Sequence, residues 1–142
     1  MKLNKNVYVL LCSIFMVYVA FLFFFALVHR IWVGDISVRT ELFWGYNNPT
    51  DQIIWDNVIN ICVFIPIGLL VAVLCDKYVI LKSMLVGLFI SETIESCQLI
   101  FKRGTFDVDD IFNNVLGALI GATAYIIIAF IWNLVSRCCS SN

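Results

Sequence analysis

The stretch from Ser91 to Gly121 reads SETIESCQLIFKRGTFDVDDIFNNVLGALIG, and it carries five carboxylates and two bases between segments of almost purely apolar sequence. Ionisable side chains are expensive inside a bilayer, so they usually mark a working site or a buried pair that joins helices. We therefore expect the rest of the chain to form the membrane-embedded frame that holds this stretch.

The composition is that of an integral membrane protein. Of the 142 residues, 62% are hydrophobic and 13% are charged, which is too apolar for an ordinary soluble domain. The length predicts a single domain, 1–142. A formal net charge of −1 without a basic patch gives no reason to expect a nucleic-acid partner. The six cysteines have no metal-ligand spacing, and we expect them to be apolar packing residues.

Four apolar segments predict an all-α, polytopic membrane protein with four transmembrane helices. The predicted spans are 7–28, 57–75, 79–101 and 111–135. A long connection, 29–56, follows the first span, and its mixture of aromatic and polar residues suits the headgroup layer of a membrane. Thr50 is placed to cap the second helix, which would begin on the outer surface before it enters the lipid.

Small residues and one proline predict how these helices pack. Pro66 removes a backbone hydrogen bond from the second span, so we expect a kink there, close to Gly68. Gly117 and Gly121 have the GxxxG spacing that lets another helix approach closely. We expect that surface to pack on the third or second span, with a homodimer contact as the alternative.

Polar side chains are expected on one face of each of the last three spans. The third span carries the stripe Ser91, Glu95, Gln98 and Lys102, and the fourth carries Asp110, Asn114, Gly117 and Gly121. In both stripes the residues are four, three and four positions apart, which is the spacing of one helix face. Asn57 and Asn60 share a face of the second span and can reach a neighbouring helix.

The distribution of bases predicts that both termini lie in the cytoplasm. An even number of spans puts both termini on one side of the membrane, and bases gather on the cytoplasmic side. The cytoplasmic bases would be Lys2, Lys5, Lys77, Lys82 and Arg137, against Arg30, Arg39, Lys102 and Arg103 outside. Nine of the ten acids would then lie on the outer side, with only Asp76 inside.

That topology brings three polar helix ends together at the outer face. There we predict a functional polar cluster made of Asn57, Asn60, Glu95, Gln98, Arg103, Asp107, Asp109, Asp110 and Asn114. Asp107, Asp109 and Asp110 also lie where acids complement the positive end of the fourth helix, so helix capping is their alternative role.

The same residues, taken in order, resemble the VanZ-like family of small bacterial membrane proteins. The resemblance covers residues 51–125, and it rests on Asp56-Asn57-Val-Ile-Asn60, Phe64-Ile-Pro66-Ile-Gly68-Leu-Leu, Glu95-x-x-Gln98 and Gly104-Thr-x-Asp107-x-x-Asp110-x-x-x-Asn114-x-x-Gly117 with Gly121. It implies a protein of the bacterial cytoplasmic membrane, and the best-known family member is associated with resistance to teicoplanin, a glycopeptide antibiotic. It supplies no catalytic residues.

Three mechanisms and a purely structural role are open at this point. The first is a non-enzymatic protein whose amides and carboxylates bind a cell-wall precursor, another envelope ligand or a partner protein at the outer leaflet. The second is an enzyme acting on lipid-linked phosphate, with Mg²⁺ or Ca²⁺ held by oxygen ligands. The third is a small transporter that couples substrate movement to protonation of Glu95. The absence of any Ser/His or Cys/His pair disfavours the enzyme, so we expect no cofactor.

Overall fold

The computed structural model describes residues 4–28 and 37–140 of the chain. Within these residues the long helices are α1 (Lys5–Val28), α3 (Asp51–Leu74), α4 (Val79–Ile100) and α5 (Val108–Ser140). The short elements are β1 (Ser37–Arg39), α2 (Trp44–Asn47) and β2 (Thr105–Asp107). The first part of the predicted connection, 29–36, lies outside the described residues.

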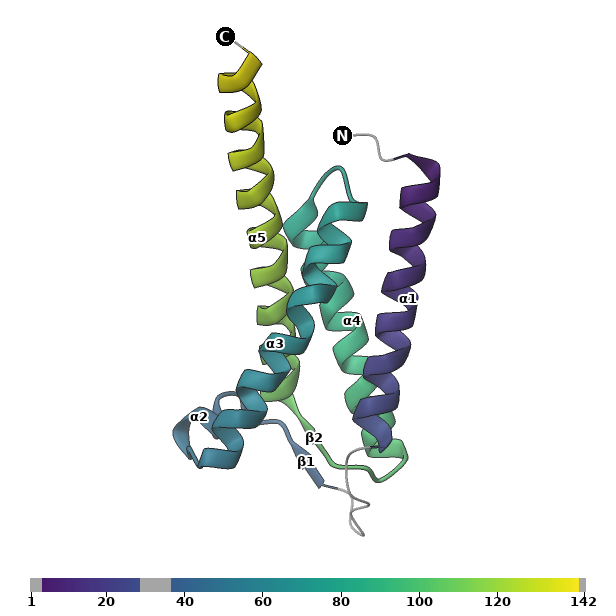
Figure 1. The fold of residues 1–142 in the computed structure, drawn as a ribbon. Coiled ribbons are helices and arrows are strands. Elements are labelled where there is room, and N and C mark those ends of the chain that lie inside the picture. The colour runs from purple at the N-terminus through teal and green to yellow at the C-terminus, as the bar shows by residue number, and fades with distance from the viewer. Residues whose placement is uncertain (1–3, 29–36, 141–142) are drawn as a thin grey trace.

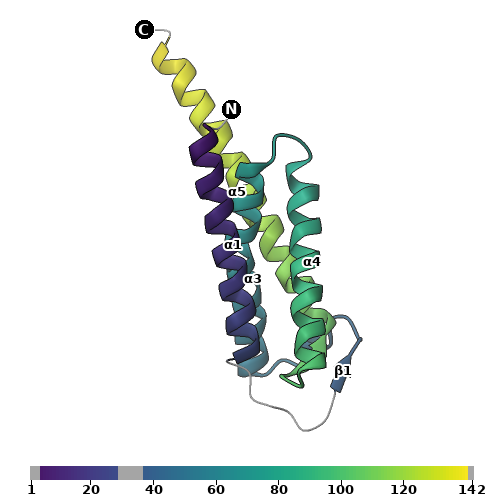
Figure 2. The same cartoon turned by 90° about the vertical axis from the view of Figure 1, so that its right-hand side faces the viewer.

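The long helices run side by side as a bundle (Figures 1 and 2). The start of α1 and the end of α5 lie at the same end, together with the turn between α3 and α4. The strands β1 and β2 and the short helix α2 lie at the opposite end. We call this opposite end the polar end, because the buried polar side chains described below gather there.

Three of the described helices have the length and hydropathy needed to cross a membrane: Lys5–Val28, Asp51–Leu74 and Val108–Cys138. The chain is therefore a multi-pass membrane protein. Helix α4 is 22 residues long but contains Lys82, Glu92 and Glu95, and this polarity sets it apart from the other three. Of its three charged side chains, Glu95 is buried within the bundle, whereas Lys82 and Glu92 are exposed.

Helix α3 begins at Asp51, within the connection predicted as 29–56. As expected, Thr50 caps it, since the side-chain oxygen accepts a hydrogen bond from the backbone N–H of Ile53 at 3.3 Å. The helix continues past Pro66 to Leu74. In the turn before Pro66, the hydroxyl of Tyr18 on α1 donates to the carbonyl oxygen of Val63 at 2.9 Å. This bond ties α1 to α3 where the proline weakens the helix's own hydrogen bonding.

The closest helix contact is the crossing of α3 and α5, where glycines bring backbone against backbone. A Cβ atom on Gly117 would lie 2.1 Å from the carbonyl oxygen of Ile61, and one on Gly121 would lie 2.0 Å from that of Ile65. Gly68 on α3 meets α5 in the same way. Both distances are far below any van der Waals contact, so only glycine permits this approach.

The apolar core fills the space between α1, α3 and α4. It consists of the buried residues Leu22, Phe64, Ile67, Ile90 and Ile94, with partly buried side chains of α1 packed against them. Leu22 is the one buried residue of α1, and most of that helix is exposed, as expected for a lipid-facing segment. The core therefore fixes α1 mainly through its second half.

Gly121→Ala tests the α3–α5 contact. The added methyl group overlaps the Ile65 carbonyl, so the helices must separate, and overpacking of this kind costs about 1–3 kcal/mol. We expect a lower melting temperature for the full-length protein in detergent. Ala20→Val, which adds bulk at an exposed position of α1, is the matched control and should melt like the wild type. Equal melting temperatures for wild type and Gly121→Ala would contradict the contact.

Candidate functional site

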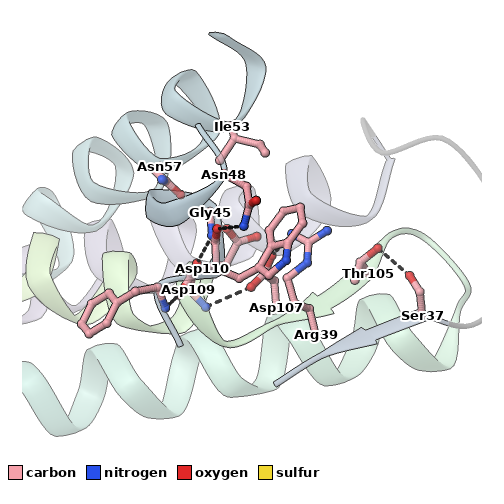
Figure 3. Close-up of polar contacts among 12 residues, drawn as sticks. Ser37, Arg39, Gly45, Asn48, Ile53, Asn57, Thr105, Asp107, Asp109 and Asp110 are labelled. Carbon is pink, nitrogen blue, oxygen red and sulfur yellow. Dashed lines mark hydrogen bonds and ion pairs between the residues drawn. The ribbon is translucent and has the colours of Figure 1, made fainter. Parts of the chain in front are cut away.

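The two short strands attach the connection before α3 to the turn before α5. They pair in parallel, with Ser37 opposite Thr105 and Arg39 opposite Asp107. The hydroxyls of Ser37 and Thr105 are 2.6 Å apart, and the guanidinium of Arg39 donates to the carboxylate of Asp107 at 2.7 Å (Figure 3). The same guanidinium lies 3.9 Å from the centre of the Trp44 ring, a cation–π contact. Arg39 therefore links all three short elements.

Asp109 holds α2 against the start of α5. Its carboxylate is 2% exposed, and it accepts hydrogen bonds from the backbone N–H groups of Phe43 and Gly45, the latter at 2.8 Å (Figure 3). Phe43 has a left-handed backbone conformation with φ of 65°, which costs free energy for a residue other than glycine. A buried carboxylate that accepts two backbone donors is a strong anchor, and it offsets this local strain.

A chain of polar side chains continues from α2 through α5 to α3. The hydroxyl of Tyr46 donates to the side-chain carbonyl of Asn113, whose amide nitrogen donates to Asn57 at 2.9 Å. Burial raises the pKa of the Tyr46 hydroxyl above its usual value of 10, and the charge of Asp109 raises it further, although the bond to Asn113 acts the other way. At neutral pH the hydroxyl therefore keeps its proton and remains a donor.

The remaining carboxylates lie around the junction of β2 and α5. Glu95, 1% exposed on α4, accepts from the backbone N–H of Asp107 at 3.0 Å. The other carboxylate oxygen of Asp107 accepts from the backbone N–H of Asp109 at 3.0 Å, which caps the first turn of α5. Asp110 accepts from the amide of Asn60 on α3 at 2.6 Å. Glu95, Asp107, Asp109 and Asp110 thus each accept a hydrogen bond from a donor within the protein.

Two buried oxygens in this layer have no hydrogen-bond partner among the described residues: Oε1 of Gln98 and Oδ1 of Asn114. Gln98 is 1% exposed and Asn114 is 4% exposed. Their nitrogens are engaged, since Asn114 donates to the Ser91 hydroxyl at 2.8 Å and Gln98 donates to the Ala26 carbonyl at 3.5 Å. Unpaired buried acceptors are uncommon in folded proteins and require an explanation.

Gln98 and Asn114 both line a cavity of about 260 Å³ within the bundle. The cavity is lined by Leu22, Phe25, Ala26, Asp56, Ile59, Asn60, Val63, Phe64, Ile94, Glu95, Gln98 and Asn114. Its apolar walls come from α1 and α3, whereas most of its polar groups come from α4 and α5. A mostly apolar pocket with a few convergent polar groups is the usual form of a small-molecule site.

The structure brings most of the residues of the predicted cluster into this layer or into the cavity wall. Arg103 differs: it is half-buried in the turn after α4 and its backbone N–H donates to the Gln98 carbonyl at 2.8 Å, whereas the cation beside Asp107 is Arg39. Lys102, predicted on the polar stripe of the third span, lies beyond the end of α4 and is exposed. Within the described residues, no group of three or more His, Cys, Asp or Glu side chains could hold a metal ion.

Sequence reasoning missed several residues of the site, chiefly Arg39, Tyr46, Asn113 and the backbone donors of Phe43 and Gly45. Four of these lie in the connection before α3, where no periodicity marks a contact with α5. Asn113 is adjacent to a predicted residue but is one position off the stripe through Asp110 and Asn114. Its total burial follows from contact with α2 and α3 together.

The helices and this layer define a class: a multi-pass helical membrane protein with a buried polar layer at one end of its bundle. The VanZ/LLP1 family model matches residues 9–130, which is most of the chain. The chain therefore belongs to the VanZ/LLP1 family, and the resemblance drawn from residues 51–125 is confirmed. No curated protein and no solved structure matches the chain at a significant level.

Asp109→Asn tests the anchor of α2. Asparagine keeps the shape but has one acceptor oxygen, so one of the two backbone N–H groups loses its partner. We expect a loss of about 2–4 kcal/mol of local stability, measured as faster amide hydrogen exchange over residues 43–48. Glu92→Gln, which neutralises an exposed acid of α4, is the control and should leave exchange unchanged. Unchanged protection in Asp109→Asn would show that the anchor does not hold α2.

Proposed function

We propose that this protein binds an envelope ligand or partner at its polar end and thereby lowers susceptibility to teicoplanin-type glycopeptides. The observation that carries the proposal is a pair of buried, unpartnered oxygens, Gln98 Oε1 and Asn114 Oδ1, in two residues that line a cavity in an otherwise paired layer. Leaving a buried acceptor unpaired costs about 1–3 kcal/mol. A ligand that donates hydrogen bonds to these two oxygens would offset the cost when it is bound. The unpaired oxygens therefore favour a binding role.

The proposal includes four membrane spans, of which α4 is the third along the chain. At about 1.5 Å per residue, the 22 residues of α4 extend about 33 Å, enough for a hydrocarbon core of about 30 Å. Its buried acid, Glu95, faces protein, and Lys82 is within one turn of the helix start, where a long side chain reaches the membrane surface. These features support α4 as a membrane-spanning helix despite its charges.

The proposed location is the bacterial cytoplasmic membrane, with both termini in the cytoplasm and the polar end outside. Support comes from the slight excess of bases at the opposite end among the described residues, and from the start of α1 and the end of α5, which lie at that same end. Alkaline phosphatase, which is active only outside the cytoplasm, should be inactive when fused after Asn142. The same enzyme inserted in the α1–α3 connection is the positive control. An active C-terminal fusion would reverse the proposed orientation.

The engagement of the acids favours binding over metal catalysis. Asp109 binds α2, Asp107 binds Arg39, and Asp110 binds Asn60, so these acids point to separate partners in place of a shared ion. Transport through the bundle is also disfavoured, because the buried polar groups gather at one end, and the other half has chiefly Ser83, which bonds to the Gly68 carbonyl. An envelope-facing binding protein needs polar groups at one end only.

Drug susceptibility of a teicoplanin-sensitive host tests the proposal. Expression of the wild type should raise the inhibitory concentration, and Glu95→Gln and Asp110→Asn should each abolish the increase at equal membrane abundance, since both remove a carboxylate of the polar layer. Glu92→Gln, an exposed acid on the same helix as Glu95, should behave like the wild type. A wild-type protein that confers no resistance would refute the glycopeptide role.

A further inference from the structure

The cavity opens between α1 and α3. Among its lining residues, Leu22, Phe64 and Glu95 are buried, whereas Phe25 on α1 is 44% exposed and Ile59 on α3 is 46% exposed. Asp56 on α3 also lines the cavity and is exposed, so these three residues mark the mouth. Phe25 and Ile59 are large apolar side chains within helices long and apolar enough to cross a membrane, whereas Asp56 is charged, so the mouth lies where the lipid chains meet the polar membrane surface. A ligand that enters here comes from the bilayer.

The polar lining is rich in acceptors. It includes two carboxylates, Glu95 and Asp56, and among the described lining residues there is no Lys, Arg or His. All three lining amides donate within the protein: Asn60 to Asp110, Asn114 to Ser91 and Gln98 to the Ala26 carbonyl. Two of the three amide oxygens have no such partner. The lining thus suits a head group that donates hydrogen bonds and carries positive charge.

The size of the cavity decides how much of a ligand it holds. Pockets for drug-sized ligands enclose about 300–1,000 Å³, so a cavity of about 260 Å³ accommodates a small head group and no complete lipid or antibiotic. The apolar remainder of the ligand must leave through the mouth. Phe25 and Ile59 provide the apolar contact that an acyl chain would need there.

We propose that this cavity binds the primary ammonium head group of a membrane lipid, with its N–H groups donating to Gln98 Oε1 and Asn114 Oδ1. The carboxylates of Glu95 and Asp56 balance the charge, and the acyl chains pass between α1 and α3. This inference rests on the proposed function, because it names the chemistry of the ligand for the same site. Such a site would distinguish lipids by the N–H donors of their head groups and would not recognise a phosphate group alone.

Native mass spectrometry of the full-length protein in detergent tests the inference. The probes are dioleoyl phosphatidylethanolamine, phosphatidylcholine and phosphatidylglycerol, which share their chains and phosphate, whereas only the first carries a primary ammonium. We expect one phosphatidylethanolamine per chain, bound about tenfold more tightly than either other lipid, because it alone combines hydrogen-bond donors for the orphaned oxygens with a positive charge for the lining carboxylates. Equal binding of the three lipids would overturn the proposal.

Two variants locate the site. Gln98→Leu removes an orphaned oxygen at similar volume and should reduce the preference for phosphatidylethanolamine to less than about threefold. The melting temperature should change little, because the oxygen has no partner to lose and the amide nitrogen loses only its long 3.5 Å bond to the Ala26 carbonyl. Ala26→Trp fills the cavity and should abolish the bound lipid. Its matched control is Val17→Trp, at a 70% exposed position of α1. Unchanged selectivity in both Gln98→Leu and Ala26→Trp would overturn the assignment.

The lipid assay uses no cells, so its outcome is separate from the susceptibility test. Loss of resistance in Glu95→Gln and Asp110→Asn without lipid selectivity in the wild type would overturn the ammonium ligand and leave the proposed function intact. Selective binding of phosphatidylethanolamine without resistance would support the ligand and refute the glycopeptide role.

Discussion

Gly117 and Gly121 let α5 lie so close to α3 that a methyl group on either would overlap a backbone carbonyl. This close approach fixes the position of α5 along the axis of α3. Within two helical turns of Gly117, Asp110 accepts a hydrogen bond from Asn60 and Asn113 donates one to Asn57. Buried polar pairs are stable only when both partners are in register, because an unpaired group in a low dielectric is costly. The glycine contact therefore positions the polar layer as well as the helices.

The start of α5 is held from two sides. On one side, Glu95 of α4 accepts from the backbone N–H of Asp107. On the other, Asp109 accepts from two backbone N–H groups of the connection that contains α2. The acids that follow Gly104 thus do more than complement a helix dipole: they join α4, α5 and the connection into one unit.

Against this pairing, the unpartnered oxygens of Gln98 and Asn114 are the exception. Both belong to residues that are almost completely buried, and both line the same cavity. A fold optimised only for stability would replace such groups with apolar side chains of similar volume, since that replacement is often neutral or stabilising. Their presence beside two carboxylates motivates the ligand chemistry proposed above.

The sequence by itself determined the long helices, because each apolar run of about 20 residues can satisfy its backbone hydrogen bonds in a membrane only as a helix. The Thr50 cap and the polar face of α4 up to Gln98 also follow from local rules, which depend on residues a turn apart. Three features did not follow from the sequence: the parallel pairing of β1 with β2, the contact of Arg39 with Asp107, and the cavity between α1 and α3. These join segments more than 30 residues apart, where no periodicity applies. Only the packing of the helices decided them, since it sets which distant polar groups meet and which two oxygens are left without a partner.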